Sequence, residues 1–238
     1  MPANCLLYYI TDRTAFAGDE SSRRRRLVEK IAEAARAGVD YIQLREKDLS
    51  TRELELLAKE AVSAIRQARL SSGNSQPATA LLINSRTDVA LAVDADGVHL
   101  RSDDVSAEVV RASWIKFGAG IPFDKLRAGS ARQNPPQASV VAVSCHSRAE
   151  VVEAAAQGAT FAVFGPVFQK HGGQKHGVRP AGLELLRQAC LANIPVLALG
   201  GITLENASSC FAAGAAGIAA IRLFQDNDIS RVVKQLRG

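Results

Sequence analysis

The sequence predicts an α/β protein folded as a single (β/α)8 TIM barrel, and three observations lead to that prediction. Eight short runs rich in β-forming residues recur along the chain, and segments with helical periodicity separate them. Three Gly-containing phrases, at residues 37–40, 95–98 and 213–218, each end a predicted helix and begin a strand. The 238 residues suit one closed barrel. An open, doubly wound sheet is the less favoured alternative, because eight alternating βα units in one domain suit closure better.

The predicted strands are short and mostly apolar. They occupy residues 6–10, 41–44, 80–83, 97–100, 140–143, 161–164, 196–199 and 217–221. The segments between them contain the Ala, Leu, Glu and Arg expected of helices that cover a parallel sheet. The clearest helices are predicted at residues 23–37, 51–70, 149–157, 183–192 and 207–213.

Residues 115–138, between the fourth helix and the fifth strand, break this pattern. They are rich in Gly, Pro and basic residues and have no usable periodicity, which predicts an irregular surface insertion. A lid over a functional site is the alternative interpretation. It is less favoured because a segment that precedes a strand lies at the N-terminal end of the barrel, away from the face that carries sites. Residues 1–238 are therefore predicted to form one domain.

Composition narrows the functional classes. Lys plus Arg is 29 and Asp plus Glu is 24, so the net charge of 29 − 24 = +5 suits anionic ligands without requiring nucleic acid. Aromatic residues make up 5% of the chain, too few for a base-stacking surface, and the Arg23–Arg26 run indicates a solvated helix face. The four cysteines lie far apart, which favours neither a zinc site nor a disulfide framework. Without a leader pattern or a bilayer-length apolar stretch, we expect a cytoplasmic protein that binds small phosphorylated molecules, with no membrane or nucleic-acid partner; a homo-oligomer is compatible with the sequence.

The most informative local feature is a comb of alternating charges that follows the second predicted strand. Gln43, Arg45 and Lys47 occupy every second position, with Glu46 and Asp48 between them. Strand alternation would turn the first three side chains to one side. Two neighbouring cations there repel each other unless an anion lies between them. The comb therefore predicts a phosphorylated ligand.

Polar residues or glycines also follow the other predicted strands, where barrels of this kind carry their sites. They are Asn84 and Ser85, Arg101 to Asp104, Ser144 with Cys145 and His146, the loop that contains Lys170 and Lys175, Gly200 and Gly201, and Ile221 with Arg222. A Gly pair after one strand and backbone amides after the next, each leading into a helix, predict a phosphate site.

Several ordered motifs at these strand ends resemble thiamine phosphate synthase, and the resemblance spans nearly the whole chain. They are Gln-Leu-Arg-Glu-Lys-Asp at 43–48, Ile-Asn at 83–84, Ala-Asp-Gly-Val-His-Leu at 95–100, Val-Ser-Cys-His-Ser at 143–147, Phe-Gly-Pro-Val-Phe at 164–168 and Leu-Gly-Gly-Ile at 199–202. The resemblance implies coupling of hydroxymethylpyrimidine diphosphate to a thiazole phosphate, with release of pyrophosphate, in thiamine biosynthesis.

The same resemblance implies roles for individual residues. Arg45, Lys47 and a magnesium ion held in part by Asp104 would stabilise the leaving diphosphate. Gln43 and Asn84 would orient that group, and Ser144 would line the pyrimidine site. Backbone amides near Gly200, Gly201 and Ile221 would hold the thiazole monophosphate.

The chain departs from the family pattern in its metal site. Ser85 occupies the position of one of the two carboxylates that hold magnesium in the family, so the ion is expected to bind weakly or through the substrate's phosphates.

Two further departures concern phosphate binding. The loop after Gly165-Pro166 lacks the family's phosphate-binding motif, and Lys170 or Lys175 is predicted to replace its lysine. Arg222 occupies the place of a small Ser, where it either adds donors to the monophosphate site or blocks that site.

Two other functions stay open. His146 could act as the general base of a thiazole tautomerase, a related barrel enzyme that moves a proton on the thiazole ring. A non-catalytic phosphate-ligand protein is favoured if Arg222 occupies the phosphate site. His99 is predicted to be a packed core residue, and Cys145 beside His146 is not predicted to be a nucleophile, because adjacent strand residues face opposite ways.

Overall fold

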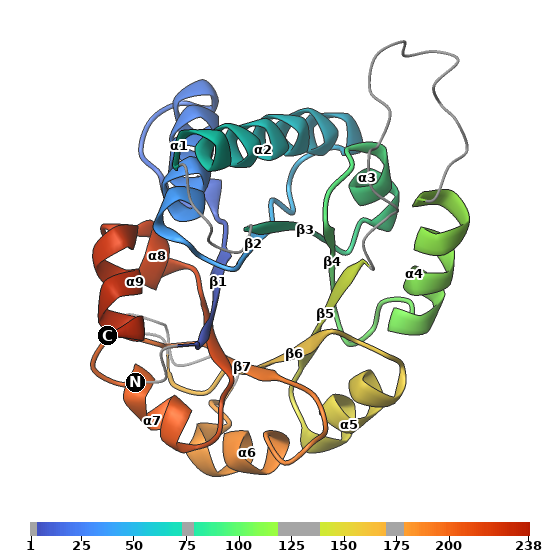
Figure 1. Cartoon of the computed structure of the whole chain (residues 1–238), viewed down its shortest axis with the longest axis vertical. Helices are drawn as coiled ribbons and strands as arrows, with labels where there is room; N and C mark the ends of the chain where they lie inside the picture. The colour runs from blue at the N-terminus through green and yellow to red at the C-terminus, as the bar shows by residue number, and fades with distance from the viewer. Residues whose placement is uncertain (1–3, 73–78, 119–138, 170–178) are drawn as a thin grey trace.

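Eight parallel strands form a closed barrel, in chain order, in a computed structural model that describes residues 4–72, 79–118, 139–169 and 179–238 (Figure 1). β1 (Leu6–Ile10) pairs with β2 (Tyr41–Leu44) and with β8 (Gly217–Ala220), and these two pairings close the ring. The strands between β2 and β8 are β3 (Ala80–Asn84), β4 (Gly97–Leu100), β5 (Val140–Cys145), β6 (Phe161–Phe164) and β7 (Val196–Leu199). The predicted (β/α)8 barrel is confirmed, and β5 continues two residues beyond its predicted end.

The helices surround the ring of strands (Figure 1). They are α1 (Glu20–Ala37), α2 (Thr51–Ser72), α3 (Thr87–Ala92), α4 (Ala107–Ser113), α5 (Arg148–Ala156), α6 (Gly182–Ala189), α7 (Ala207–Ala212), α8 (Arg222–Gln225) and α9 (Ile229–Arg237), with a 3-10 turn η1 (Arg13–Ala15) and a π-helical turn η2 (Trp114–Gly118). Among the described helices, none combines the length and the apolar character needed to cross a membrane.

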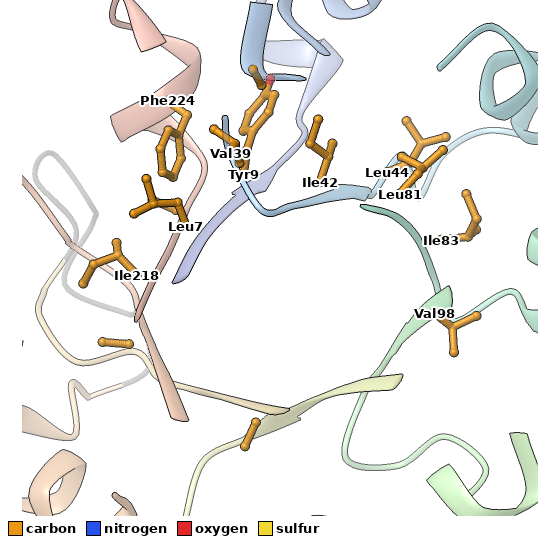
Figure 2. Packing of buried hydrophobic residues seen from close by; sticks show 14 of the residues in the cluster. Leu7, Tyr9, Val39, Ile42, Leu44, Leu81, Ile83, Val98, Ile218 and Phe224 are labelled. Carbon is orange, nitrogen blue, oxygen red and sulfur yellow. The ribbon is translucent and has the colours of Figure 1, made fainter. Parts of the chain in front are cut away.

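Two layers of apolar side chains hold the barrel together. On β1, Leu7 and Tyr9 point outward and pack with residues such as Ile42 and Phe224 between the strands and the helices (Figure 2). The alternate β1 residue Tyr8 points inward and packs against Phe161 inside the barrel. This period-two alternation fills the interior with apolar and aromatic side chains. Most of the polar groups that could bind a ligand are therefore found at the strand ends.

The start of α1 differs from the prediction. The helix begins at Glu20, so the arginine run lies inside it rather than at its first residue. Arg25 is exposed, as a solvated face requires, but Arg24 is partly buried and pairs with Glu20 and Glu53. The run therefore also ties α1 to the start of α2.

Two of the three predicted Gly stops are observed. Gly38 and Gly214 have φ values of 82° and 99° and follow the ends of α1 and α7. At the middle phrase, the residue just before it, Asp94, takes the left-handed conformation instead, with φ of 58°, and Gly97 is the first residue of β4. Asp is one of the residues that tolerates this conformation, so the stop shifts to it.

The prediction of an irregular insertion at residues 115–138 is wrong for its first four residues. Residues 114–118 form the turn η2, which continues α4, so residues 115–118 have regular structure. Residues 119–138 lie outside the described part of the chain.

Candidate functional site

A cavity of about 910 Å³ opens at the C-terminal ends of the strands, and residues at or just after the end of every strand line it. Ile10 comes from β1, and Ile221 directly follows β8. This is the end of a parallel barrel at which loops can combine side chains from different strands, and at which (β/α)8 enzymes carry their sites. We call it the strand-end cavity.

Most of the sequence-predicted site residues meet there. Those that line the strand-end cavity are Gln43, Arg45, Lys47, Asn84, Ser144, His146, Gly200 and Ile221. Gly201, Asp104 and Arg222 are not among the lining residues. Lys170 and Lys175 lie outside the residues that the structure describes.

The comb after β2 supplies cations to this cavity. Gln43 is buried, and its side-chain amide donates to Oδ1 of Asn84 at 2.9 Å. The guanidinium of Arg45 and the ammonium of Lys47 have no hydrogen-bond or ion-pair partner among the described residues. The positive charge of Arg45, followed by partial burial and the charge of Arg101, lowers the pKa of Lys47. An anion in the cavity would relieve this repulsion.

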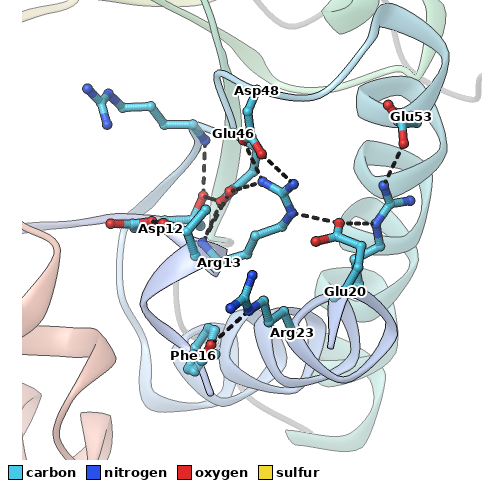
Figure 3. Close-up of polar contacts among 12 residues, drawn as sticks. Asp12, Arg13, Phe16, Glu20, Arg23, Glu46, Asp48 and Glu53 are labelled. Carbon is cyan, nitrogen blue, oxygen red and sulfur yellow. Dashed lines mark hydrogen bonds and ion pairs between the residues drawn. The ribbon is translucent and has the colours of Figure 1, made fainter. Parts of the chain in front are cut away.

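The alternate carboxylates of the comb face the other way and bind Arg13 (Figure 3). Arg13 is 4% exposed; its Nη1 lies 3.2 Å from Glu46 Oε2, and its two terminal nitrogens donate to Asp48 at 2.7 Å each. Its Nε donates to Glu20 at 2.8 Å. The guanidinium thus uses its donors on three carboxylates, and this arrangement leaves the cavity side of the comb to the cations.

Thr11 at the end of β1 completes this network. Its hydroxyl donates to Glu46 at 2.6 Å and accepts from the backbone amide of Arg45 at 3.0 Å. Burial raises the pKa of Glu46, and the hydrogen bonds from Thr11 and Arg13 offset this only in part. The backbone that carries Arg45 is therefore fixed to β1 through a buried carboxylate.

A buried chain of hydrogen bonds reaches the cavity from inside the barrel. His99 is 3% exposed; Nδ1 lies 2.9 Å from the hydroxyl of Tyr8 and Nε2 lies 2.7 Å from Oγ of Ser144. Burial, with a further contribution from the charge of Arg45, lowers the pKa of His99 to about 3, so the ring is neutral at physiological pH.

The direction of each hydrogen bond in this series follows from which atoms can donate a proton. The buried hydroxyl of Tyr8 has no other acceptor among the described residues, so it donates to Nδ1 of His99. Nε2 of His99 then carries the proton and donates to Ser144, whose own O–H is free to donate into the cavity. His99 is packed and satisfied, as predicted, and it also orients Ser144.

His146 and Cys145 at the end of β5 differ in their surroundings. Nδ1 of His146 lies 2.6 Å from the carbonyl oxygen of Gly165, and because a carbonyl only accepts, Nδ1 carries the proton and Nε2 of the neutral ring is unprotonated. Cys145 is fully buried in the outer core, and burial raises the pKa of its thiol to about 12. Its thiol is not a candidate nucleophile.

The turns after β7 and β8 also contribute to the wall of the cavity, through Gly200 and Ile221. Gly200 and Gly201 have φ values of 99° and 65°, and a Cβ on Gly201 would lie 2.8 Å from Cβ of Phe168. Glycine is therefore required for both the conformation and the close approach. Arg222, the first residue of α8, is exposed, and its side chain has no hydrogen-bond or ion-pair partner in the described part of the chain.

The residues present do not fit a magnesium site held by the protein. Oδ2 of Asp104 accepts from Ser85 Oγ at 2.6 Å and from the amide of Arg101 at 2.8 Å, and Oδ1 faces the Arg101 guanidinium at 3.3 Å. No group of three or more His, Cys, Asp or Glu side chains suited to a metal occurs among the described residues. Magnesium favours near-octahedral oxygen coordination, and the oxygens of Asp104 already face hydrogen-bond donors.

The lining residues without an assigned role in the sequence prediction include Arg101, Asp103, Phe168 and Arg179. Arg101 could be found from its place directly after a predicted strand. Arg179 is the first described residue after position 169, and no periodic sequence pattern predicts that it lines the cavity. Arg13, outside the cavity, has a weak sequence signal, since Glu46 and Asp48 need a cationic partner if they turn away from the ligand.

Comparison with known proteins agrees with this geometry. A family model described as thiamine monophosphate synthase matches residues 7–224. The chain is 37% identical to the thiamine-phosphate synthase of Chlorobium luteolum over 82% of this chain and 77% of that protein, and 33% identical to that of Clostridium novyi over 96% and 94%. Among solved structures, it is similar to the thiamine phosphate pyrophosphorylase from Pyrococcus furiosus, with a TM-score of 0.70, 30% identity and coverage of 99% of this chain and 95% of the other. The chain belongs to the thiamine monophosphate synthase family.

Proposed function

We propose that the protein is a transferase that couples hydroxymethylpyrimidine diphosphate to a thiazole phosphate and releases pyrophosphate. The observation that carries this proposal is that alternate side chains after β2 face in two different directions. Arg45 and Lys47 line the cavity without a described anionic partner, while Arg13 holds the alternate carboxylates away. A site of this kind suits a group that carries several negative charges, and a diphosphate leaving group gains such charge as its bond breaks.

The other lining residues fit the two substrates. Breaking the bond between the pyrimidine methylene and the diphosphate leaves a carbocation, and the thiazole nitrogen donates its electron pair to it. Arg45 and Lys47 would stabilise the charge that builds on the leaving oxygens, and Gln43, held by Asn84, would orient the diphosphate. Ser144 would donate its hydroxyl to an acceptor on the pyrimidine ring. No protein nucleophile is required.

The test is an assay of the purified protein with both substrates. We expect thiamine phosphate and pyrophosphate to appear in equal amounts, and Arg45→Gln to lower turnover by at least about tenfold, since a charged hydrogen bond contributes roughly 1.5–3 kcal/mol. Arg52→Gln, which changes an exposed arginine of α2 that does not line the cavity, is the matched control. Absence of both products under conditions where both substrates bind would reject the proposal.

A second candidate, thiazole tautomerase activity, is favoured by the geometry of His146. With Nδ1–H bound to Gly165, Nε2 is the ring nitrogen able to accept a proton in a cavity that fits a small heterocycle. The test is deuterium exchange into the thiazole phosphate in heavy water. Exchange that the parent supports and His146→Gln abolishes would establish this activity, whereas exchange at the rate of the protein-free control would exclude it.

The non-catalytic alternative has no such support. It depends on Arg222 occupying the phosphate site, and Arg222 is exposed and does not line the cavity.

A further inference from the structure

Three cations from two loops gather at one side of the strand-end cavity. Arg45 and Lys47 follow β2, and Arg101 follows β4; all three line the cavity. The charge of Arg45, followed by partial burial and the charge of Arg101, lowers the pKa of Lys47, as expected for cations that share one cavity wall. Arg101 therefore adds a guanidinium to the region assigned to the diphosphate, next to the carboxylate of Asp103, which lines the same cavity.

Asp104 and Asp103 contact Arg101 and position it. Its backbone amide donates to Asp104 Oδ2 at 2.8 Å, and its Nε and one terminal nitrogen lie 3.4 and 3.3 Å from Oδ1. Its Nε also lies 3.3 Å from Asp103. These side-chain contacts are long for charge-assisted bonds, and the side chain stays 53% exposed, so the guanidinium keeps donors for a ligand.

Ser85 supports the same arrangement. Its φ of 57° places it in the left-handed region, and its hydroxyl donates to Asp104 Oδ2 at 2.6 Å while accepting from the side-chain Nδ2 of Asn84 at 3.3 Å. A carboxylate at this position would lie next to Asp104 and would have no proton to donate to it. The serine thus leaves Asp104 as a partner for Arg101 rather than as one of a pair of metal ligands.

We propose that Arg101 supplies the third positive charge of the diphosphate site, with Asp104 and Ser85 as its positioning residues, and that this chain binds pyrophosphate without a magnesium ion held by the protein. The inference rests on the proposed function, because it assumes that the strand-end cavity takes a diphosphate. It explains why the carboxylate of Asp104 is bound to donors instead of being free to coordinate an ion.

The test is calorimetric titration of the full chain with inorganic pyrophosphate in excess EDTA. The parent should bind, and Arg101→Gln should bind roughly 10- to 100-fold more weakly, the range expected for one charge-assisted contact. Arg101→Lys, which keeps the charge but loses the planar fork, should fall between them. Arg52→Gln should bind within about twofold of the parent, since it changes an exposed charge outside the cavity.

A second series separates positioning from folding. Ser85→Asp should weaken binding in EDTA and regain it when free magnesium is added, because it restores a pair of carboxylates and withdraws Asp104 from Arg101. Ser85→Ala removes one donor and adds no metal ligand, so it should weaken binding without any gain from magnesium. Thermal melting of each variant checks that the fold is retained; a merely structural role would change the melting temperature and not the response to magnesium.

The outcomes distinguish this inference from the function it rests on. If the parent binds pyrophosphate only when magnesium is present, and Arg101→Gln matches it, the role of Arg101 is wrong while the diphosphate site stands. If the parent binds no pyrophosphate with or without magnesium, both fail.

Discussion

The loop after β2 and the turns after β7 and β8 line the same cavity, but different forces shape them. After β2, a buried arginine and three carboxylates hold the backbone that carries Arg45 and Lys47. After β7, Gly200 and Gly201 adopt left-handed conformations against Pro166 and Phe168, and the described residues provide no comparable ion network there. One side of the site therefore depends on charge, and the other depends on close backbone packing. Changes in pH and salt should separate the two.

The largest effect on stability is expected from Arg13→Gln, which removes the ion pairs after β2. The variant leaves the buried carboxylate of Glu46 without its cation, a change that typically costs about 3–5 kcal/mol in the free energy of unfolding. Denaturant unfolding measures it. Arg25→Gln is the control, since Arg25 is 72% exposed and its contact with Glu29 is 3.9 Å long, so its cost should be below about 1 kcal/mol.

The pH dependence of Arg13→Gln follows from the direction of the Glu46 shift. Burial raises the folded-state pKa of Glu46, so the folded protein binds more protons than the unfolded chain between the usual and the raised pKa, and stability falls as pH rises through this window. Loss of Arg13 raises that pKa further. The pKa values of Glu20 and Asp48, which hydrogen bonds from Arg13 lower, return toward their usual range, and stability at neutral pH is lost. The cost should therefore be larger at pH 7 than at pH 4; an equal cost at both would contradict the ion network.

The next largest effect on stability is expected from Gly201→Ala, which disturbs the close backbone packing after β7. A left-handed alanine costs about 1–2 kcal/mol, and its Cβ would also lie 2.6 Å from the carbonyl oxygen of Gln169. Gly182→Ala is a matched control, because Gly182 has φ of +78° but a Cβ there would meet nothing within 4 Å. Denaturant unfolding should show the larger loss for Gly201→Ala, with little dependence on pH. Equal losses would mean that close approach contributes nothing.

The smallest effect is expected from Arg222→Ser. Arg222 is exposed and outside the cavity lining, so thiazole phosphate affinity should change by less than about threefold. Titration with thiazole phosphate at low and high salt measures it. A loss above tenfold that shrinks at high salt would show that Arg222 reaches the phosphate when substrate binds, and a gain in affinity would show that it obstructs the site.

The sequence predicts the parts of this molecule that depend on local periodicity. The strands follow from apolar runs, and the direction of Arg45 and Lys47 follows from period-two alternation that continues past the end of β2 at Leu44. Arg13 could not be assigned in this way, because its contacts with Glu46 and Asp48 depend on the pairing of β1 with β2.

The same limit applies to residues whose roles depend on contacts between strands. Tyr8 contacts Ser144 only through His99, across three strands. The hydrogen bond from Ser85 to Asp104 depends on the left-handed backbone conformation of Ser85, and no sequence pattern predicts that conformation. Both arrangements need the closed barrel before they can be recognised.

The central claim, that the cations after β2 bind a diphosphate, is tested most directly by calorimetric titration of the parent, Arg45→Ala and Arg52→Ala with inorganic pyrophosphate at one ionic strength. The predicted result is a loss of roughly 10- to 100-fold in affinity for Arg45→Ala, as expected for a charge-assisted contact, and no change beyond about twofold for Arg52→Ala. Equal affinities for the parent and Arg45→Ala would contradict the claim.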